Sequence, residues 1–406
     1  MSTRQLHFAE FVALVALMFA IIAIGVDAML PAFPEIALDF GLDDVNRAQL
    51  VITAFILGNG GGQMVMGPLS DSLGRKPVIY AGILIYIIAC ALAVYADSFE
   101  LLLMARFVQG FGASAPRAVT MAMIRDQYDG RRMAQVMSLA MTLFVLVPAI
   151  APLMGQAVML RFGWRSIFVA FMLFAFIGLM WLALRQPETH PQERRQRLNP
   201  RRYLSALREV LTSKVVVTYM VAMSCGYGAL FGYLSSAQQI YVDVFNAGTD
   251  FPVYFAAIAV LSGSAGILNA RLVVRYGMRR LATLAFLTML LLTLAYFLLL
   301  RNFELSGTLQ FRLFLGWSLV AFMTPGLTFG NLNALAMEPM GHVAGMAAAV
   351  IGAVSTVLGV VIAIPIGQAF DGTIQPLLIG FAINMLVALG LMLSNPKARP
   401  APASAG

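Results

Sequence analysis

Twelve apolar runs, each close to 20 residues or longer, recur along this chain of 406 residues and are separated mostly by short polar connections. An α-helix needs about 20 apolar residues to cross the hydrocarbon core of a bilayer. The runs predict membrane-spanning helices over residues 8–33, 47–67, 78–96, 101–124, 133–160, 165–185, 214–241, 253–274, 281–300, 310–336, 343–368 and 375–394. Only 11% of the residues are charged, against about 25% in soluble domains. We therefore expect an all-α integral membrane protein.

One long polar connection, residues 186–213, divides the predicted helices into six and six. The chain is thus expected to consist of an N-terminal half (1–185), this linker, a C-terminal half (214–395) and a short tail (396–406). Within the linker, Leu204, Leu207 and Leu211 fall on one helical face among arginines. This pattern predicts an amphipathic helix on the membrane surface; a regulatory or partner-binding role is the alternative.

Basic residues fix the expected orientation, because cytoplasmic loops of membrane proteins carry an excess of Lys and Arg. With the N-terminus in the cytoplasm and an uncleaved first span, 20 of the 27 basic residues fall on the cytoplasmic side. Five fall on the opposite side, and Arg106 and Arg117 lie inside a span. Both termini are therefore expected to be cytoplasmic. The same bias explains the net charge of +8 without a nucleic acid partner.

Other residues that could carry chemistry are sparse. Cys90 and Cys225 each lie inside an apolar run, and the three histidines show no metal-ligand spacing. The loops contain no Ser/His/Asp set and no phosphate-binding Gly-x-x-x-x-Gly-Lys-Ser/Thr motif. We therefore expect no metal, no cofactor and no enzyme activity. A membrane-embedded enzyme or sensor is the competing class, but short loops speak against it.

The two halves of the chain carry a related loop. Gly74 with Lys76, after the second span, matches Gly277 with Arg279, after the eighth. Together with the six-plus-six pattern, this predicts duplicated halves. Secondary transporters are commonly built in this way and bind substrate at the interface between the halves.

The first of these loops, 67-GPLSDSLGRKP-77, contains glycines that permit a tight reversal and an acid that can face a helix N-terminus. It resembles the signature loop of the major facilitator superfamily, Gly-x-Leu-x-Asp-x-x-Gly-Arg-Lys, with Ser72 replacing the usual basic residue. The matching positions are Gly67, Asp71, Gly74 and Arg75.

The resemblance implies a gate at the cytoplasmic side. Asp71 would face the eleventh span, which begins near residues 341–345, and this contact would help to close the cytoplasmic side. Arg75 and Asp126 would join a charge network at the inner mouth.

The fourth span carries two polar residues on one face. Arg106 and Gln109 are one helical turn apart, and a snorkelling arginine would explain the first but not the second. Both are therefore expected to point into the bundle interior or a watery cavity. The stretch resembles the superfamily's Arg-x-x-Gln-Gly-x-Gly motif.

The fifth span contains Pro148, Pro152 and Gly155, which predict a kink and a close helix contact. A small-residue face at 262–266 offers a matching surface. The stretch 148–155 is similar to the signature of the antiporter branch of the superfamily. Ordinary transmembrane packing is the alternative.

The first span ends in 27-DAMLPAFPEI-36, and Asp27 is the one acidic residue in the interior of a predicted span. Intramembrane acids are costly and usually functional. With Leu30, Pro31 and Pro34, the stretch resembles the end of the first span in the Bcr/CflA branch of twelve-span drug:proton antiporters. The resemblance implies that Asp27 exchanges the proton while Arg106 and Gln109 hold its carboxylate. A structural cap before Pro31 is the alternative for Asp27.

We expect export of small amphipathic drugs, such as phenicol- or bicyclomycin-like antibiotics, by a monomer in the inner membrane. Flexible methionines and aromatic rings suit such a cavity. The candidate substrate residues are Asn59, Met137, Met141, Tyr233, Gln238 and Asn331. A transporter specific for one metabolite, such as a sugar or an amino acid, is the alternative function.

Overall fold

The computed structural model describes residues 6–195 and 199–394, and this part of the chain is helical, without β-strands. The first half comprises α1 (Phe8–Asp27), α2 (Phe33–Asp39), α3 (Leu50–Leu73), α4 (Arg75–Val94), α5 (Phe99–Gln127), α6 (Gly130–Phe162) and α7 (Ser166–Arg185). The remainder comprises α8 (Pro200–Thr212), α9 (Lys214–Gln239), α10 (Phe251–Ser262), α11 (Ser264–Tyr276), α12 (Met278–Asn302), α13 (Gly307–Met337), α14 (Ala344–Gln368) and α15 (Gln375–Ser394).

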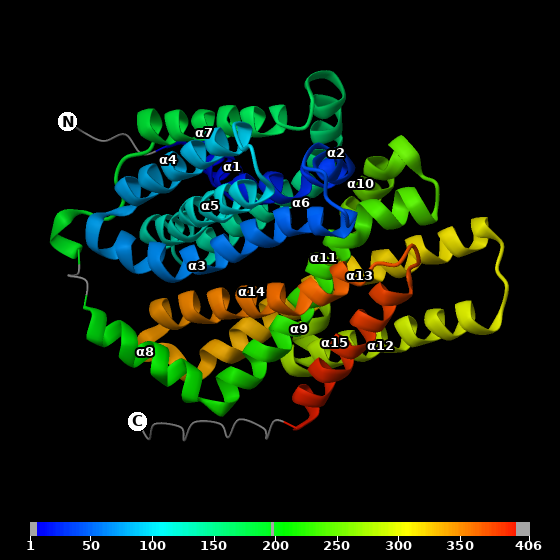
Figure 1. Cartoon of the computed structure of the whole chain (residues 1–406). Helices are drawn as coiled ribbons and strands as arrows, with labels where there is room; N and C mark the ends of the chain where they lie inside the picture. The colour runs from blue at the N-terminus through cyan, green and yellow to red at the C-terminus, as the bar shows by residue number, and fades with distance from the viewer. Residues whose placement is uncertain (1–5, 196–198, 395–406) are drawn as a thin grey trace.

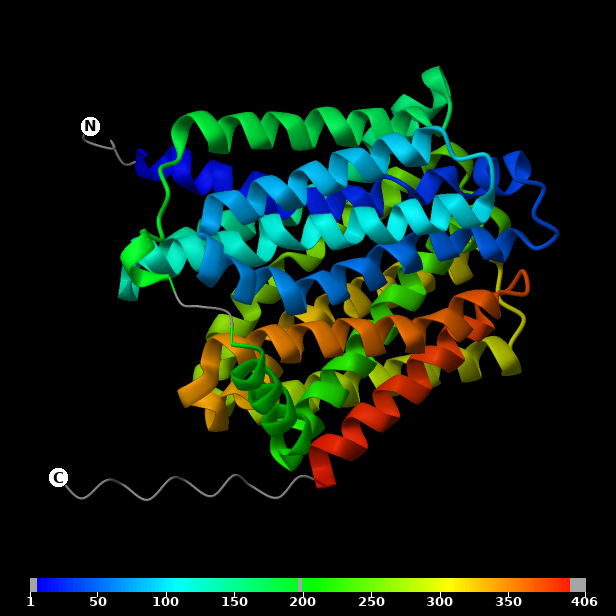
Figure 2. The same cartoon turned by 60° about the vertical axis from the view of Figure 1, so that its left-hand side comes forward.

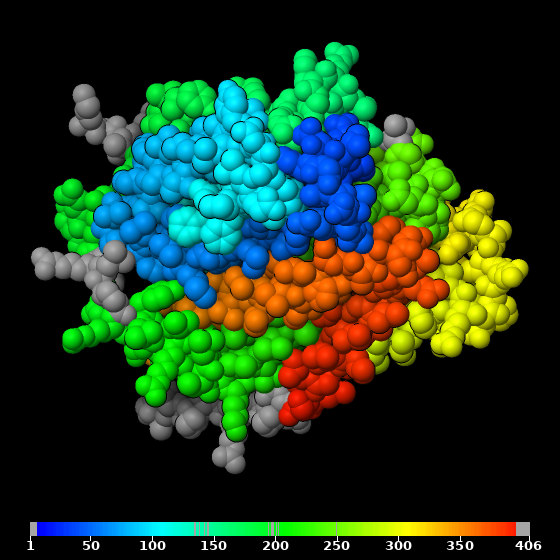
Figure 3. Space-filling model, in the orientation of Figure 1, coloured from blue at the N-terminus to red at the C-terminus, as the bar shows by residue number. Residues whose placement is uncertain are grey.

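The helices form two bundles, α1–α7 and α9–α15, which lie side by side (Figures 1 and 2). They meet where α3 packs against α14 and α6 against α10. Figure 3 shows the orange surface of α14 against the blue surface of the first bundle. A glycine makes the close approach possible, since a Cβ on Gly60 would lie 2.8 Å from Val357. The two bundles therefore pack along a seam made of these two helix pairs.

Among residues 6–195 and 199–394, ten helical segments are long and apolar enough to cross a membrane. One of them, Gly307–Gln368, spans 62 residues and contains both α13 and α14. These two helices are joined by the 3₁₀ segment η6 (Glu338–Val343), where Met340 leaves helical geometry. Helix α5 is not among the ten and carries Arg106 and Arg117 along its length.

The loop expected at 67–77 is mostly helical. Helix α3 continues to Leu73, and only Gly74 separates it from α4. Gly74 has φ 102° and Gly277, between α11 and α12, has φ 77°, a region of backbone conformation that favours glycine. The two turns predicted to be equivalent thus share one conformation. The role expected of Gly67 in a close-packed reversal is wrong, because a Cβ there would meet open space.

The linker helix α8 forms close to its predicted position. Ala206 and Val210 are buried on α9 and α14, and the Tyr203 hydroxyl donates to the Met64 carbonyl at 3.0 Å. Leu204 and Leu211 are 64% and 45% exposed. The helix is therefore fixed to the protein on one face and leaves leucines on the other, as a helix at a membrane surface would.

Candidate functional site

Asp27 is the last residue of α1 and is only 5% exposed. Among the described residues, no hydrogen bond or ion pair to its carboxylate is found, and Ala28 instead donates its N–H to the Ile24 carbonyl. The C-terminal end of a helix carries partial negative charge, so a carboxylate there is not a stabilising cap. The geometry therefore does not support the capping alternative.

Arg106 is fully buried and joins three helices of the first half. Its guanidinium donates to the Gly25 carbonyl at 2.7 Å, to the Gln109 Oε1 at 2.6 Å and to the Val51 carbonyl at 3.1 Å. It also lies over the Phe55 ring, 4.4 Å from the centroid. The expected direct contact of Arg106 and Gln109 with the Asp27 carboxylate is not present. Arg106 instead holds the chain two residues before Asp27.

The fifth-span motif reaches the same region from the other side. Pro148 and Pro152 lie inside α6, and Gly155 packs against the backbone of Ala28, so that a Cβ there would collide with it. The close contact is thus made with the residue after Asp27. The expected match of Gly155 with residues 262–266 is wrong, although α6 does pack against α10.

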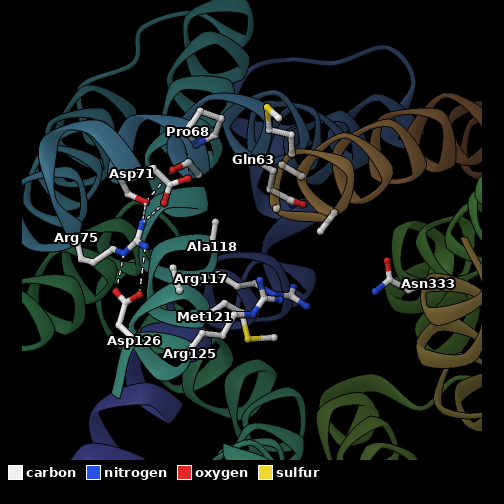
Figure 4. Close-up of a pocket in the computed structure, with 17 residues that line it drawn as sticks. Gln63, Pro68, Asp71, Arg75, Arg117, Ala118, Met121, Arg125, Asp126 and Asn333 are labelled. Carbon is white, nitrogen blue, oxygen red and sulfur yellow. Dashed lines mark hydrogen bonds and ion pairs between the residues drawn. The ribbon is translucent and has the colours of Figure 1, made fainter. Parts of the chain in front are cut away.

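Arg75 forms a buried charge network between α3, α4 and α5, shown in Figure 4. Its guanidinium donates to Asp71 at 2.5 Å and to Asp126 at 2.9 Å, and also to the Ser70 hydroxyl at 2.8 Å. Arg75 is 5% exposed. The structure therefore brings Asp71, Arg75 and Asp126 together, as the superfamily resemblance implied.

Two further residues of this Arg75 network come from the segment after α7. The Thr189 hydroxyl donates to Asp126 at 3.0 Å, and the Glu188 carboxylate accepts the backbone N–H groups of Arg75 and Lys76 at 3.0 Å each. Glu188 thus caps the positive N-terminal end of α4. Neither residue was predicted from the sequence, because only a polar connection marks them.

A cavity of about 370 Å³ opens beside the Arg75 network, between the two bundles. Its walls include Asp71, Arg117 and Arg125 from one half and Asn333 and Gly345 from the other (Figure 4). Helix α14 begins at Ala344, within the range expected for the eleventh span. Among the described residues Asp71 makes no hydrogen bond to it, so the gate contact implied by the resemblance is not formed in this structure.

The opposite end of α3 is joined to the other bundle by amide side chains. Gln49 donates to Gln239 at 2.6 Å, and Gln239 donates to the Asn46 Oδ1 at 2.8 Å. Asn46 donates in turn to the Phe370 carbonyl at 2.9 Å, and Gln368 donates to the Asn46 carbonyl at 2.8 Å. We call Asn46, Gln49, Gln239 and Gln368 the amide cluster. It lies about 36 Å from the Arg75 network, the length of the 24-residue helix α3.

The six candidate substrate residues do not line this cavity. Tyr233 is fully buried in the second bundle, where its hydroxyl bonds Tyr241 and Ser318 at 3.2 and 3.0 Å. Its ring packs among aromatic side chains, so it belongs to the packing of that half.

The side chains of the other five candidates are also enclosed, fully or in part, within the helix bundles. Asn59 accepts from Gln63 at 2.7 Å, Asn331 donates to Asn269 at 2.7 Å, and both are about 5% exposed or less. The remaining three are buried or partly buried: Met137, Met141 and Gln238. Their role toward a substrate stays a prediction.

Comparison with known families decides the class of protein. The sequence profile described as Major Facilitator Superfamily matches residues 15–364. The chain belongs to this superfamily. It is therefore a multi-pass membrane protein of a transporter family, and the resemblance found in its motifs is confirmed.

Its relatives in the superfamily include resistance proteins of bacteria. A bicyclomycin resistance protein homolog of Haemophilus influenzae is 29% identical over 91% of both chains. A chloramphenicol resistance protein of Pseudomonas aeruginosa is 31% identical over 63% of this chain and 60% of its own. The uncharacterized MFS-type transporter YdgK of Bacillus subtilis is 28% identical over 85% of both. In bacteria such transporters lie in the inner membrane.

Solved structures confirm the fold. The D-xylose-proton symporter superposes with a TM-score of 0.73 at 13% identity, over 94% of this chain and 97% of its own. The human organic anion transporter MFSD10 gives 0.65 at 19% identity, over 96% and 100%. At these identities the likeness concerns architecture alone.

Proposed function

We propose that this protein exports small amphipathic molecules, such as phenicol- or bicyclomycin-like antibiotics, across the inner membrane in exchange for protons. The resistance proteins among its relatives support the substrate class. In the same proposal the transporter acts as a monomer made of the halves 1–185 and 214–395, with residues 186–213 as a cytoplasmic linker.

Twelve membrane crossings fit the helices better than ten. The 62-residue segment Gly307–Gln368 would cross twice, because η6 separates α13 from α14. Helix α5, with 29 residues, would be a further crossing in spite of Arg106, because that charge is buried inside the bundle. An even number of crossings places both termini on the same side, which the bias of basic residues makes the cytoplasm.

With this orientation, the structure would correspond to an inward-facing state of the transporter. The cavity lies at the end of the bundle that carries Arg75 and Arg125, the cytoplasmic end, while the amide cluster closes the other end. Alternating access would then require the amide cluster to separate and α14 to approach Asp71.

The observation that carries proton coupling is the buried, unpaired carboxylate of Asp27. A carboxylate removed from water is costly in its charged form. The charge state of Asp27 and its access to water must therefore change together as the cavity opens to one side and then the other. Arg106 would position the site, because its bond to the Gly25 carbonyl fixes the end of α1.

The test is drug-induced proton release from purified wild-type protein and Asp27→Asn. We expect chloramphenicol to release protons from the wild type and none from the variant. The affinity of the variant for the drug should stay within a few-fold of the wild-type value. Asp39→Asn is the matched control, because Asp39 is an exposed carboxylate on α2 that pairs with Arg165. Uphill export by Asp27→Asn in proteoliposomes with an unchanged pH dependence would remove Asp27 from the mechanism.

A further inference from the structure

Arg117 is a charged side chain that the proposed mechanism leaves without a role. It lies on α5 eleven residues after Arg106, is exposed to the cavity, and makes no hydrogen bond or ion pair with any described residue. Arg75, by contrast, is bonded to two carboxylates. Figure 4 shows Arg117 extending from α5 into the cavity, away from the Arg75 network.

The long helices of the opposite wall offer no acid with which Arg117 could pair, and Glu338 in η6 is exposed and is not among the residues that line the cavity. Helices α9, α11, α13 and α14 contain no Asp or Glu. The two acids that line the cavity, Asp71 and Asp126, are both held by Arg75. In this state no lining acid is therefore free to pair with Arg117, and its counter-charge is left to a ligand.

Aromatic rings of the second bundle lie close to the same position. Tyr227 of α9 lies within electrostatic range of Arg117, although neither Tyr227 nor its ring partners are among the residues that line the cavity. The ring of Tyr227 packs on Phe329 with centroids 4.2 Å apart and stacks on Phe231 at 5.4 Å. These three side chains are partly buried, so their rings are not fully enclosed by the protein.

We propose that the cavity also binds molecules that combine an aromatic body with a carboxylate, with Arg117 binding the carboxylate and the Tyr227–Phe329 pair, beside the cavity, contacting the aromatic part. The planar guanidinium matches a carboxylate with two parallel hydrogen bonds. Aromatic ligands gain further from offset or edge contacts with the rings. This inference rests on the proposed function, because it adds an anionic class of substrate to the neutral drugs proposed for the same transporter.

The test compares equilibrium binding of two probes of the same shape, 1-naphthoate and 1-naphthamide, to the full-length protein in nanodiscs. A hydrogen-bonded charge pair corresponds to roughly ten- to a hundredfold in affinity. We expect the wild type to prefer naphthoate by about tenfold or more. Arg117→Gln should lose this preference while its affinity for naphthamide is unchanged, which also shows that the variant is folded. Arg117→Lys should keep part of the preference.

Arg312→Gln is the matched control, because it removes the same charge from an exposed position of α13 that does not line the cavity. It should keep the preference for naphthoate. No preference in the wild type, no binding of either probe, or an equal loss in Arg312→Gln would each overturn the inference. Binding is measured without a proton gradient, so a failure of drug–proton exchange leaves this result readable. A wild type that exchanges protons for chloramphenicol but shows no preference for naphthoate refutes the inference alone.

Discussion

The two ends of α3 are held by polar clusters of different kinds. The amide cluster is neutral, and its hydrogen bonds join residues of the two bundles that are up to 324 positions apart in sequence. The Arg75 network is charged and binds α3, α4, α5 and the segment after α7, all on one side of the seam. One cluster closes the interface between the bundles, and the other consolidates a single bundle.

The charge of each cluster fits the contact that it makes, between the bundles for the amide cluster and within one bundle for the Arg75 network. Neutral amides that separate can exchange their partners for water at small net cost, since a neutral hydrogen bond contributes only about 1 kcal/mol. A buried arginine that loses its carboxylates leaves an uncompensated charge, which costs several times more. Under the proposed alternating access, a contact that breaks in every cycle is therefore better made from amides, and a bundle that moves as one body is better held together by charges.

Of the changes proposed here, Arg75→Ala should have the largest effect on stability. It removes the buried guanidinium from which Asp126 and Ser70 accept hydrogen bonds, and should lower the free energy of unfolding by about 3 kcal/mol or more. Thermal unfolding of the purified protein measures the loss. Asp71→Asn is the control, because the Asp71 side chain is 56% exposed and its pair is worth at most about 1 kcal/mol. Equal losses for the two variants would show that burial does not set the strength of this network.

Gln239→Leu should have an intermediate effect. It should change the populations of the folded conformations rather than the free energy of unfolding. Gln239 links Gln49 to Asn46 and is 4% exposed, so the closed end loses two hydrogen bonds, or about 1–3 kcal/mol. Spin labels at the exposed Asp43 and Asp371, one on each half, should report a new population at longer distance.

The control for this change is Gln375→Leu, an exposed amide outside the amide cluster, which should leave the distance distribution unaltered. An unchanged distribution in Gln239→Leu would mean that apolar packing along α3 and α14 closes this end and the amides only accompany it.

The sequence predicted the two ends unequally well. Asp71 and Arg75 are four residues apart on either side of the Gly74 turn, so a local motif brings them together. The family resemblance implied that Arg75 and Asp126 join a charge network, whereas Glu188 and Thr189 were missed because their contacts depend on where the segment after α7 returns. The fold class, which depends on apolar runs, was predicted with the least information.

The amide cluster was out of reach of the sequence for a physical reason. Asn46 and Gln368 each lie near a helix end, where an amide is ordinary, and only the docking of the two bundles brings them together. The same docking decides which polar residues face the cavity. Asn333 lines it, whereas Asn331, two residues earlier, bonds Asn269. Both residues lie within one helical turn, so only tertiary packing determines which of them faces the cavity.

Glu209→Gln should have the smallest effect of the three. Glu209 on α8 pairs with His342 in η6 at 2.8 Å, but the two side chains are 40% and 59% exposed. Exposed pairs contribute from nothing to about 1 kcal/mol, and salt screens them. The pair also joins the linker to the second bundle only, so it neither closes the cavity nor bridges the seam. We expect a shift in unfolding free energy of about 0.5 kcal/mol or less, vanishing at high salt. A larger shift that persists in high salt would show that α8 fixes η6 and the start of α14, and would make the linker a third region that governs how α14 approaches Asp71.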